Sequence, residues 1–382
     1  MRIAHISDTH LGYRQYNLEE RENDIYEAFN QVIEKVLEER VNVVIHSGDL
    51  FDSYRPPIKA LKIFKEAVKK LSDSKIKIIS VLGDHDTPKR RGLPPHSLFD
   101  EVKVLGIGKL EWIEVNEVLI AGISNLRGRG IELLKTELRK FDSIASKYKK
   151  SILIAHQGID RYLPFEEAYE LKEDDLPRKA TYYAFGHIHS RILTKFGRGY
   201  LAYAGSIEIM RRDEIESWNK MGKGFFIVDF ERDEPEVHRI NIDIRPQYKI
   251  EVDLTRNRLE DILLKHISSN CEKAPILHIF ISGKNVNVQQ VIRKLNILLR
   301  GKVLKYNILF RDLISPQQAT PLRSSEGSSI NLRVLISEYL RKHGIKDQKY
   351  VNLALDLYEH LSEGELKQAK EIIKNFLESG SQ

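Results

Sequence analysis

Short apolar segments alternate with amphipathic ones in the N-terminal part of the chain. Ile3–Ser7, Val41–Ser47 and Ile76–Leu82 are apolar runs rich in β-branched residues, and acidic residues follow each of them. Such runs are typical of buried strands. Between them, Asn23–Arg40 and Ile58–Leu71 carry apolar residues at helical spacing. The pattern predicts strands that alternate with helices.

From about Lys103 the apolar segments become shorter and more closely spaced, which predicts a mixed or antiparallel sheet with few helices between its strands. The predicted strands are Leu119–Ile123, Ile152–His156, Tyr182–Phe185, Leu201–Ala204, Phe225–Phe230 and Val237–Ile242. Residues 1–243 are therefore expected to form one α/β domain of packed sheets flanked by helices.

Arg245-Pro246 marks the expected boundary of this domain. Residues 244–314 predict a small α+β module, and residues 315–329, rich in Pro, Ser, Gln and Gly, predict a linker. Residues 330–382 carry three short amphipathic helical patterns, of which the third follows a Ser362-x-x-Glu365 capping box. We see no internal repeat.

Composition narrows the class of protein. The chain is 41% hydrophobic and 30% charged, with a net charge of +6 that permits a polyanionic partner without requiring one. One cysteine, Cys271, excludes an internal disulfide framework and suits a reducing compartment. No stretch resembles a signal peptide or a membrane helix, so we expect a cytoplasmic protein with no membrane contact.

The residues that indicate chemistry are acids and histidines at the C-terminal ends of predicted strands, where side chains from distant parts of a chain converge. They occur as Asp-x-His, Gly-Asp, Gly-Asp-His-Asp, a single His and Gly-His-x-His. The candidate ligands are Asp8, His10, Asp49, Asp84, His156, His187 and His189. Seven ligands exceed what one metal ion needs and suit two ions that share a carboxylate. Mixed nitrogen and oxygen ligands suit Mn, Fe or Zn, and a pair of such ions can hydrolyse phosphate esters.

Any one of these histidines alone is more often a buried, hydrogen-bonded residue than a ligand. We give that interpretation to the histidines outside the pattern: His5, His46, His96, His238, His266, His278, His343 and His360. Five separate motifs, each after an apolar strand and each carrying ligand-type residues, jointly favour metal.

At these residues the sequence resembles the calcineurin-like metallophosphoesterase superfamily, whose signature is D-x-H, G-D, G-N-H-[DE], H and G-H-x-H. The resemblance covers residues 1 to about 230. It implies a four-layer α/β/β/α sandwich with a dinuclear site at the sheet edge, followed here by the smaller module and the helical segment.

Three stretches resemble, more narrowly, the Mre11 (SbcD) family of double-strand break repair nucleases: HISDTHLGYRQY, GDLFDSYRP and AFGHIH. This resemblance implies a Mn²⁺-dependent nuclease at the nucleoid that processes DNA ends, as a 3′–5′ exonuclease on double strands and an endonuclease on single strands. It implies that residues 244–314 form a DNA-binding capping domain, and that residues 330–382 dock on an ABC-type ATPase, Rad50 or SbcC. It also implies a homodimer, for which Ile58–Leu71 and Leu93–Phe99 are candidate contacts.

The resemblance assigns a role to each candidate. Asp8, His10 and His189 would hold one Mn²⁺ ion, Asp49 would bridge, and Asp84, His156 and His187 would hold the other, with Mg²⁺ or another divalent ion as alternatives. His85 would lie beside the scissile phosphate and help protonate the leaving 3′-oxygen. A histidine ionises near neutral pH, which suits that acid role.

Position 84 departs from the family pattern, because Asp84 stands where the family has Asn. The three carboxylates would offset three of the four metal charges, and Asp84 lacks the amide donors that could reach a substrate. We therefore expect metal to be held at least as tightly as with Asn, and turnover to be slower.

Contacts to DNA and to the partner are less specific. Lys89, Arg90 and Arg91 follow the third motif, and Arg14 lies after the first. These four residues are candidate phosphate contacts, and solvated loops are the plain alternative. In the tail the candidate partner contacts are Leu335, Tyr339, Leu357, Ile373 and Phe376. The alternative is that these apolar stripes pack on the body of the protein.

Two other functions compete with the nuclease. One is another metallophosphoesterase, such as a protein phosphatase or a small-nucleotide phosphodiesterase. GDLFDSYRP lacks the G-D-x-V-D-R-G pattern of phosphatases, and a small substrate needs no extra module. The other is a weakly catalytic DNA-end scaffold, which Asp84 alone supports.

Overall fold

The computed structural model describes residues 1–88, 92–163, 169–267, 273–284, 286–314, 340, 345, 348–362 and 366–379. Contacts divide the chain into two compact units. The first comprises Met1–Met210 and Glu214–Arg245, and the second comprises Arg211–Asp213 and Pro246–Gln382. No helix among the described residues is both long and apolar enough to cross a membrane.

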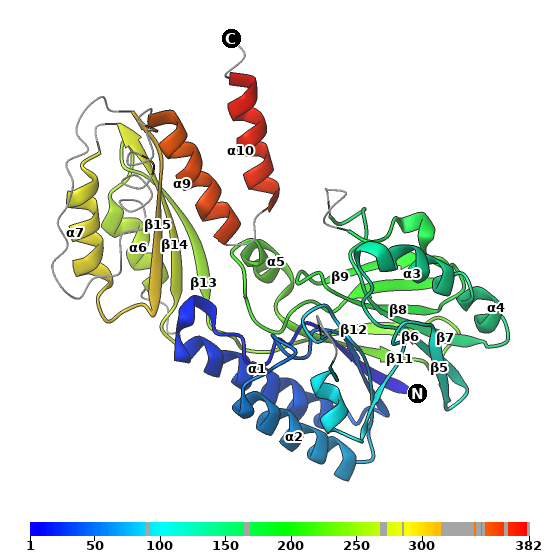
Figure 1. Cartoon of the computed structure of the whole chain (residues 1–382). Coiled ribbons are helices and arrows are strands. Elements are labelled where there is room, and N and C mark those ends of the chain that lie inside the picture. The colour runs from blue at the N-terminus through cyan, green and yellow to red at the C-terminus, as the bar shows by residue number, and fades with distance from the viewer. Residues whose placement is uncertain are drawn as a thin grey trace. The chain divides into compact units, whose positions relative to one another are not determined.

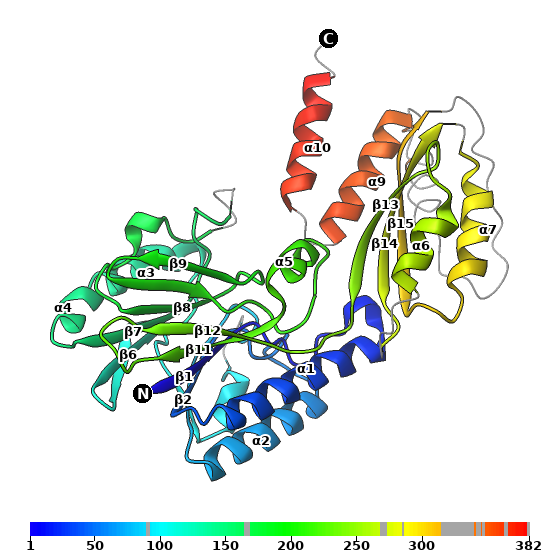
Figure 2. The same ribbon diagram turned by 180° about the vertical axis from the view of Figure 1, so that it is seen from behind.

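The first unit contains two six-stranded sheets, shown in Figures 1 and 2. The first sheet has the order β12-β11-β1-β2-β3-β4. Its strands β1 to β4 run parallel, β11 pairs antiparallel with β1, and β12 pairs antiparallel with β11. The bounds are β1 Arg2–Ile6, β2 Val43–Ser47, β3 Lys77–Val81, β4 Val102–Val104, β11 Gly224–Asp229 and β12 Glu236–Asn241.

The second sheet has the order β5-β6-β7-β8-β10-β9. Its four central strands run parallel, and β5 and β9 are antiparallel edges. The bounds are β5 Glu111–Val115, β6 Val118–Ile123, β7 Lys150–His156, β8 Tyr182–Gly186, β9 Ile192–Phe196 and β10 Gly199–Tyr203. The sheet is mixed, as the spacing of its strands predicts.

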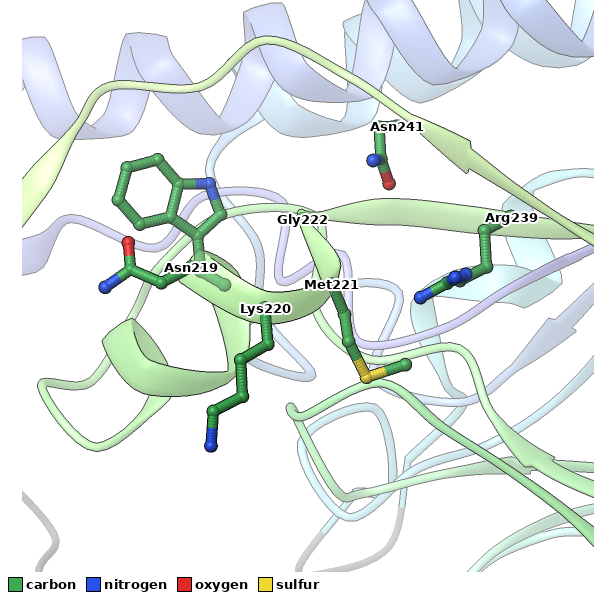
Figure 3. Close-up of a pocket in the computed structure, with 7 residues that line it drawn as sticks. Asn219, Lys220, Met221, Gly222, Arg239 and Asn241 are labelled. Atoms are coloured by element: carbon green, nitrogen blue, oxygen red, sulfur yellow. The ribbon is translucent and has the colours of Figure 1, made fainter.

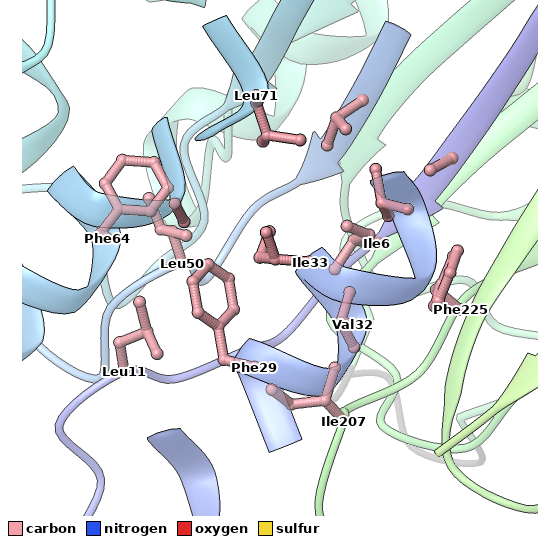
Figure 4. Packing of buried hydrophobic residues seen from close by; sticks show 14 of the residues in the cluster. Ile6, Leu11, Phe29, Val32, Ile33, Leu50, Phe64, Leu71, Ile207 and Phe225 are labelled. Carbon is pink, nitrogen blue, oxygen red and sulfur yellow. The ribbon is translucent and has the colours of Figure 1, made fainter. Parts of the chain in front are cut away.

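Three apolar cores hold four layers together. One core packs α1 (Glu19–Glu38) and α2 (Ile58–Asp73) on the outer face of the first sheet, with Phe29, Phe64 and Ile6 among its members (Figure 4). A second core packs α3 (Ile131–Leu138) and α4 (Phe141–Ala145) against the second sheet. A third joins the two sheets. The unit is therefore the α/β/β/α sandwich that the resemblance to the metallophosphoesterases implies.

The strand interiors match the predicted segments, but several elements differ. Helix α1 begins at Glu19 rather than Asn23, and the acidic residues of its first turn suit the positive end of a helix dipole. The helices α3, α4 and α5 (Glu214–Met221) and the edge strands β5 and β9 are not among the predicted elements. Each of these elements is short, and β5 and β9 alternate in exposure or are only partly buried, which weakens their apolar signal.

In the second unit, β13 (Gln247–Asp253), β14 (Ile276–Lys284) and β15 (Lys305–Ile314) form a parallel sheet. Helices α6 (Leu259–Ile267) and α7 (Val288–Leu299) lie between successive strands in sequence, so the expected small α+β module is a βαβαβ unit. Its apolar core takes residues from all three strands and both helices.

Two further helices, α9 (Gln348–Ser362) and α10 (Leu366–Ser379), contact each other. The rings of Tyr350 and Phe376 pack at a tilt of 59°, with their centroids 5.4 Å apart. Leu357 and Phe376 are partly buried and Ile373 is exposed. Of the other candidate partner contacts, Leu335 and Tyr339 lie outside the described residues, as do nearly all of the first predicted helix and the capping-box glutamate.

Candidate metal centre

The predicted ligands converge at one edge of the two sheets. Asp8 and His10 follow β1, Asp49 follows β2 and Asp84 follows β3, whereas His156 ends β7, and His187 and His189 follow β8. Their ligand atoms form several overlapping groups, each within 4.8 Å, and two of these groups consist only of predicted ligands and share no residue. We call Asp8, His10 and His189 the first ligand group, and Asp84, His156 and His187 the second.

The backbone bends sharply where the ligands leave their strands. Asp8, His10, Asp49 and His187 all have positive φ, at 48°, 43°, 53° and 92°. Residues other than glycine rarely adopt this left-handed backbone region, although Asp and His do so more readily than most. Where they do, the site is often functional. The bends let one strand end present two ligands, as in Asp8 and His10.

Glycines in the motifs make room for the ligands. A Cβ on Gly83 would lie 2.1 Å from Oδ1 of Asp49, and one on Gly48 would lie 2.4 Å from Nδ1 of His156. Gly48 also has a φ of +93°. The glycines before Asp49 and Asp84 are thus required by close packing against a ligand contributed by another strand.

The first ligand group has its histidine nitrogens turned toward each other. Nε2 of His10 lies 3.2 Å from Nε2 of His189, and the latter lies 3.9 Å from Oδ1 of Asp8. Two ring nitrogens that face each other among carboxylates are well disposed to share a cation. Asp8 is fully buried and also accepts the backbone N–H of His187 at 3.0 Å.

The second ligand group gathers around one oxygen of Asp84. Oδ1 of Asp84 lies 3.2 Å from Nε2 of His156 and 3.4 Å from Nδ1 of His187. Asp49 lies between the two groups, since its Oδ2 is 3.2 Å from Nε2 of His156 and 3.7 Å from Nε2 of His10. A carboxylate in that position can bridge two ions.

The pKa values of Asp49 and His10 are shifted in the directions expected for a site that favours positive charge. Burial alone would raise the pKa of Asp49, but His156 and His10 outweigh it and hold the pKa below its usual range. Burial alone would lower the pKa of His10, but Asp52, Asp49 and Asp8 outweigh it and raise the pKa to about 9. The Asp49 carboxylate therefore stays ionised and attracts cations.

The outer nitrogens of three histidines have acceptors of their own. Nδ1 of His156 lies 2.8 Å from the carbonyl of Ser47, and Nδ1 of His189 lies 2.9 Å from Oε1 of Glu214. Nδ1 of His10 lies 3.3 Å from Asp52. A histidine that donates through Nδ1 presents Nε2 as a neutral ligand, which is the usual arrangement around a metal. The donor set therefore fits a divalent metal centre.

Behind His189 lies a buried ion pair. The Glu214 carboxylate, 1% exposed, accepts from Nζ of Lys223, which is 4% exposed, and from Oγ of Ser206 at 2.8 Å. Lys223 also donates to the carbonyl of His189 at 3.0 Å. Glu214 is thereby fixed in the orientation that receives the His189 ring.

His85 lies at the open side of the centre, with 42% of its side chain exposed. Its backbone N–H donates to Oδ1 of Asp49 at 2.9 Å, and its Nδ1 lies 2.8 Å from the carbonyl of Asp52. Its ring packs edge-on against His10 with centroids 4.7 Å apart. The ring is therefore held at the centre. One of its nitrogens lies within 4.8 Å of ligand atoms of Asp49 and Asp84, although His85 belongs to neither of the two groups named above.

Comparison with known proteins accords with this geometry. Residues 1–191 match the family model of the calcineurin-like phosphoesterases. The chain is 39% identical to the DNA double-strand break repair protein Mre11 of Methanocaldococcus jannaschii over 372 residues, which is 96% of each chain. It is 37% identical to the Mre11 of Saccharolobus solfataricus over 385 residues, 98% of each. This chain belongs to the Mre11 family of calcineurin-like phosphoesterases. It is accordingly a metal-dependent phosphoesterase.

Three residues that contact the centre of this Mre11 family member are absent from the sequence-based candidates: Asp52, Glu214 and Arg127. Asp52 lies in GDLFDSYRP, three positions after Asp49, so the motif contained a signal for it. Glu214 and Arg127 lie outside every motif, and only the fold brings them to the ligands. The fourth residue of Gly-Asp-His-Asp, Asp86, is fully buried and accepts the backbone N–H groups of Leu50, Phe51 and Gly83, which fixes two motif loops together.

The histidines given a structural interpretation are consistent with it in part. His5, His46, His96 and His278 are buried in the Mre11 family fold, and His238 is exposed. Burial lowers the pKa of His5 to about 3, so its ring is neutral near pH 7. It lies 2.9 Å from the hydroxyls of both Tyr182 and Ser47.

Among the predicted DNA contacts, Arg14 is exposed in the loop after β1, and Lys89, Arg90 and Arg91 lie outside the described residues. A pocket of about 590 Å³ opens elsewhere in the first unit of this Mre11 family member (Figure 3). None of the seven candidate ligands lines it. Its lining residues are Trp218, Asn219, Lys220, Met221, Gly222, Arg239 and Asn241.

Proposed function

We propose that this chain is a Mn²⁺-dependent nuclease that hydrolyses phosphodiester bonds at DNA ends during double-strand break repair. The observation that carries the proposal is the pair of ligand groups with Asp49 between them, close to both. The relatives match this chain over nearly their full length and are named as DNA double-strand break repair proteins, which supports DNA as the substrate.

In this proposal Asp8, His10 and His189 would hold one ion, Asp84, His156 and His187 would hold the other, and Asp49 would serve both. Two divalent ions would supply Lewis-acid stabilisation of the phosphate oxygens and would lower the pKa of the attacking water. The chain itself supplies orientation: Ser47, Glu214 and Asp52 hold the outer nitrogens of the histidines.

His85 is the proposed acid. Its Nδ1 faces the Asp52 carbonyl at 2.8 Å, which leaves Nε2 for a substrate oxygen. From the exposed side of the centre it can stabilise the phosphorane and deliver a proton to the leaving 3′-oxygen. The proposed activities are 3′–5′ exonuclease action on double strands and endonuclease action on single strands.

The remaining roles follow the same family. We propose residues 1–243 as the nuclease domain, residues 244–314 as a DNA-binding capping domain, and residues 330–382, after the 315–329 linker, as the segment that docks on a Rad50-type ATPase. Arg14, Lys89, Arg90 and Arg91 are proposed phosphate contacts. The apolar side chains of Ile58, Leu93 and Leu98, which are 85%, 78% and 67% exposed, support a homodimer contact at α2 and the loop after β3.

The test measures nucleotide release from end-labelled linear double-stranded DNA with Mn²⁺, Mg²⁺ or a chelator. His85→Gln is compared with His238→Gln, a matched change at an exposed histidine on β12. The proposal expects Mn²⁺-dependent release in the wild type and in His238→Gln, and a loss of at least about 100-fold in His85→Gln. Hydrolysis of para-nitrophenyl phosphate esters without DNA cleavage would indicate another phosphoesterase, and DNA binding without cleavage would indicate a scaffold.

A further inference from the structure

Arg127 touches two members of the second ligand group. Its Nη1 lies 2.9 Å from Oδ2 of Asp84, and its Nη2 lies 3.4 Å from both ring nitrogens of His187. Arg127 precedes the short helix η3 (Gly128–Gly130), far from every motif in the sequence. Its side chain is 45% exposed, so the guanidinium lies at the rim of the centre.

The two oxygens of Asp84 have different partners. Oδ1 faces the ring nitrogens of His156 and His187, whereas Oδ2 accepts from Arg127. A guanidinium repels a second cation from the oxygen with which it pairs, so the pairing favours coordination through the inward oxygen of Asp84 alone.

A second carboxylate holds Arg127 from behind. Nε of Arg127 donates to Oε1 of Glu170 at 2.9 Å, and the Glu170 side chain is only 9% exposed. Oε2 of Glu170 accepts the backbone N–H of Gly158, two residues after His156. The guanidinium is thus fixed at two of its nitrogens, and its place does not depend on Asp84 alone.

The charge at the rim matters because the proposed substrate is an anion. Asp8, Asp49 and Asp84 offset most of the charge of two divalent ions, which weakens attraction for a phosphodiester. A cation against the outer oxygen of Asp84 restores one positive charge on the side where the substrate approaches.

We propose that Arg127 is a positioning residue that acts as the counter-charge of Asp84: it confines Asp84 to one inward oxygen and keeps the rim of the centre attractive to a phosphodiester. The effect proposed for substrate attraction rests on the proposed function. The effect proposed for metal binding does not, because Arg127 repels any cation in the second ligand group.

The test uses full-length wild type, Arg127→Gln, Arg127→Lys, Asp84→Asn and the double variant Arg127→Gln/Asp84→Asn. Arg161→Gln is the matched control, since Arg161 forms an exposed ion pair with Glu173 away from the ligands. Binding of Mn²⁺ is followed by the loss of the free-ion electron paramagnetic resonance signal. KM and kcat for labelled DNA are measured separately, and circular dichroism checks folding.

We expect Arg127→Gln to bind Mn²⁺ about threefold to tenfold more tightly at the more weakly binding of the two metal sites. We also expect KM for DNA to rise by a similar factor. Both changes have the size expected for one charge at a half-exposed rim. Arg127→Lys, which keeps the charge, should stay within about threefold of wild type in both quantities. Asp84→Asn should shift both quantities in the opposite direction. The double variant, which has the wild-type net charge, should return KM to within about threefold of wild type.

Two results would overturn the proposal. One is weaker or unchanged Mn²⁺ binding in Arg127→Gln, and the other is an Arg127→Lys variant that behaves like Arg127→Gln. Mn²⁺ binding can be measured without DNA cleavage. If the wild type binds Mn²⁺ but cuts no DNA, the proposed nuclease function is wrong, and the Mn²⁺ affinities of the variants still test whether Arg127 acts as the counter-charge of Asp84.

Discussion

Glu214→Gln probes the ion pair behind His189. The wild-type carboxylate does two things at once: Oε1 lies 2.9 Å from Nδ1 of His189, and Oε2 pairs with the buried Lys223. The substitution keeps the size of the side chain but removes its charge. His189 then loses its anionic partner, and the acceptors that remain for Lys223, such as the Ser206 hydroxyl and the His189 carbonyl, are neutral.

The two losses have different sizes. Loss of an outer partner of a metal-binding histidine lowers metal affinity by about 10-fold to 100-fold, or about 1.4–2.7 kcal/mol. A buried charge left without its partner costs about 3–5 kcal/mol of folding stability. At about 2–4 °C per kcal/mol for a domain of this size, the melting temperature should fall by about 6–20 °C.

Calorimetric Mn²⁺ titration and thermal unfolding without metal separate the two effects when Glu214→Gln is compared with Glu214→Gln/Lys223→Met. The double variant removes both buried charges, so it should recover most of the stability but not the Mn²⁺ affinity. If the single variant bound two Mn²⁺ ions as tightly as wild type, Glu214 would have no role in orienting His189. If the double variant recovered the affinity as well, the metal defect would be a consequence of Lys223 alone.

Three other expectations follow from the structure. Gly83→Ala should reduce nuclease activity by at least about 100-fold, because its Cβ would displace Asp49, while Gly130→Ala, where a Cβ meets nothing nearer than 3.3 Å, should retain activity; equal rates would refute the packing argument. Asp24→Ala should lower the free energy of unfolding by about 3–5 kcal/mol in urea titrations, because it removes the buried carboxylate that pairs with both Arg21 and Arg245, and a loss below about 1 kcal/mol would contradict this. Arg14→Gln should reduce the salt dependence of DNA binding, as the slope of log K against log salt, by about one; an unchanged slope would remove Arg14 from the phosphate contacts.

The sequence was most informative where a motif follows a buried strand. Asp8, Asp49 and Asp84 each follow such a strand, and the parallel order β1-β2-β3 brings them to one edge. The fold class, and the convergence of the candidate ligands at one edge, could therefore be predicted. The Gly residues of the motifs belong to the same signal, because Gly48 and Gly83 pack against ligands.

The rest could not be predicted because its signal lies in tertiary packing. Arg127 and Glu214 are ordinary charged residues in sequence, and their contacts span 43 and 25 positions. The network of Arg21, Asp24 and Arg245 likewise joins residues up to 221 positions apart. Helix α3 and strand β5 are short and only partly apolar, so local pattern alone does not distinguish them from loops.

The division of the ligands between the two sheets bears on the order in which the protein matures. Asp8, His10, Asp49 and Asp84 leave the first sheet, and the three histidines leave the second. During synthesis the carboxylates emerge long before His187 and His189, so neither half of the chain can complete the proposed centre alone. Loading of metal would then occur only after both sheets have come together, and it would add its binding energy to the seam between them. A newly synthesised chain would therefore be inactive until its two sheets have packed together.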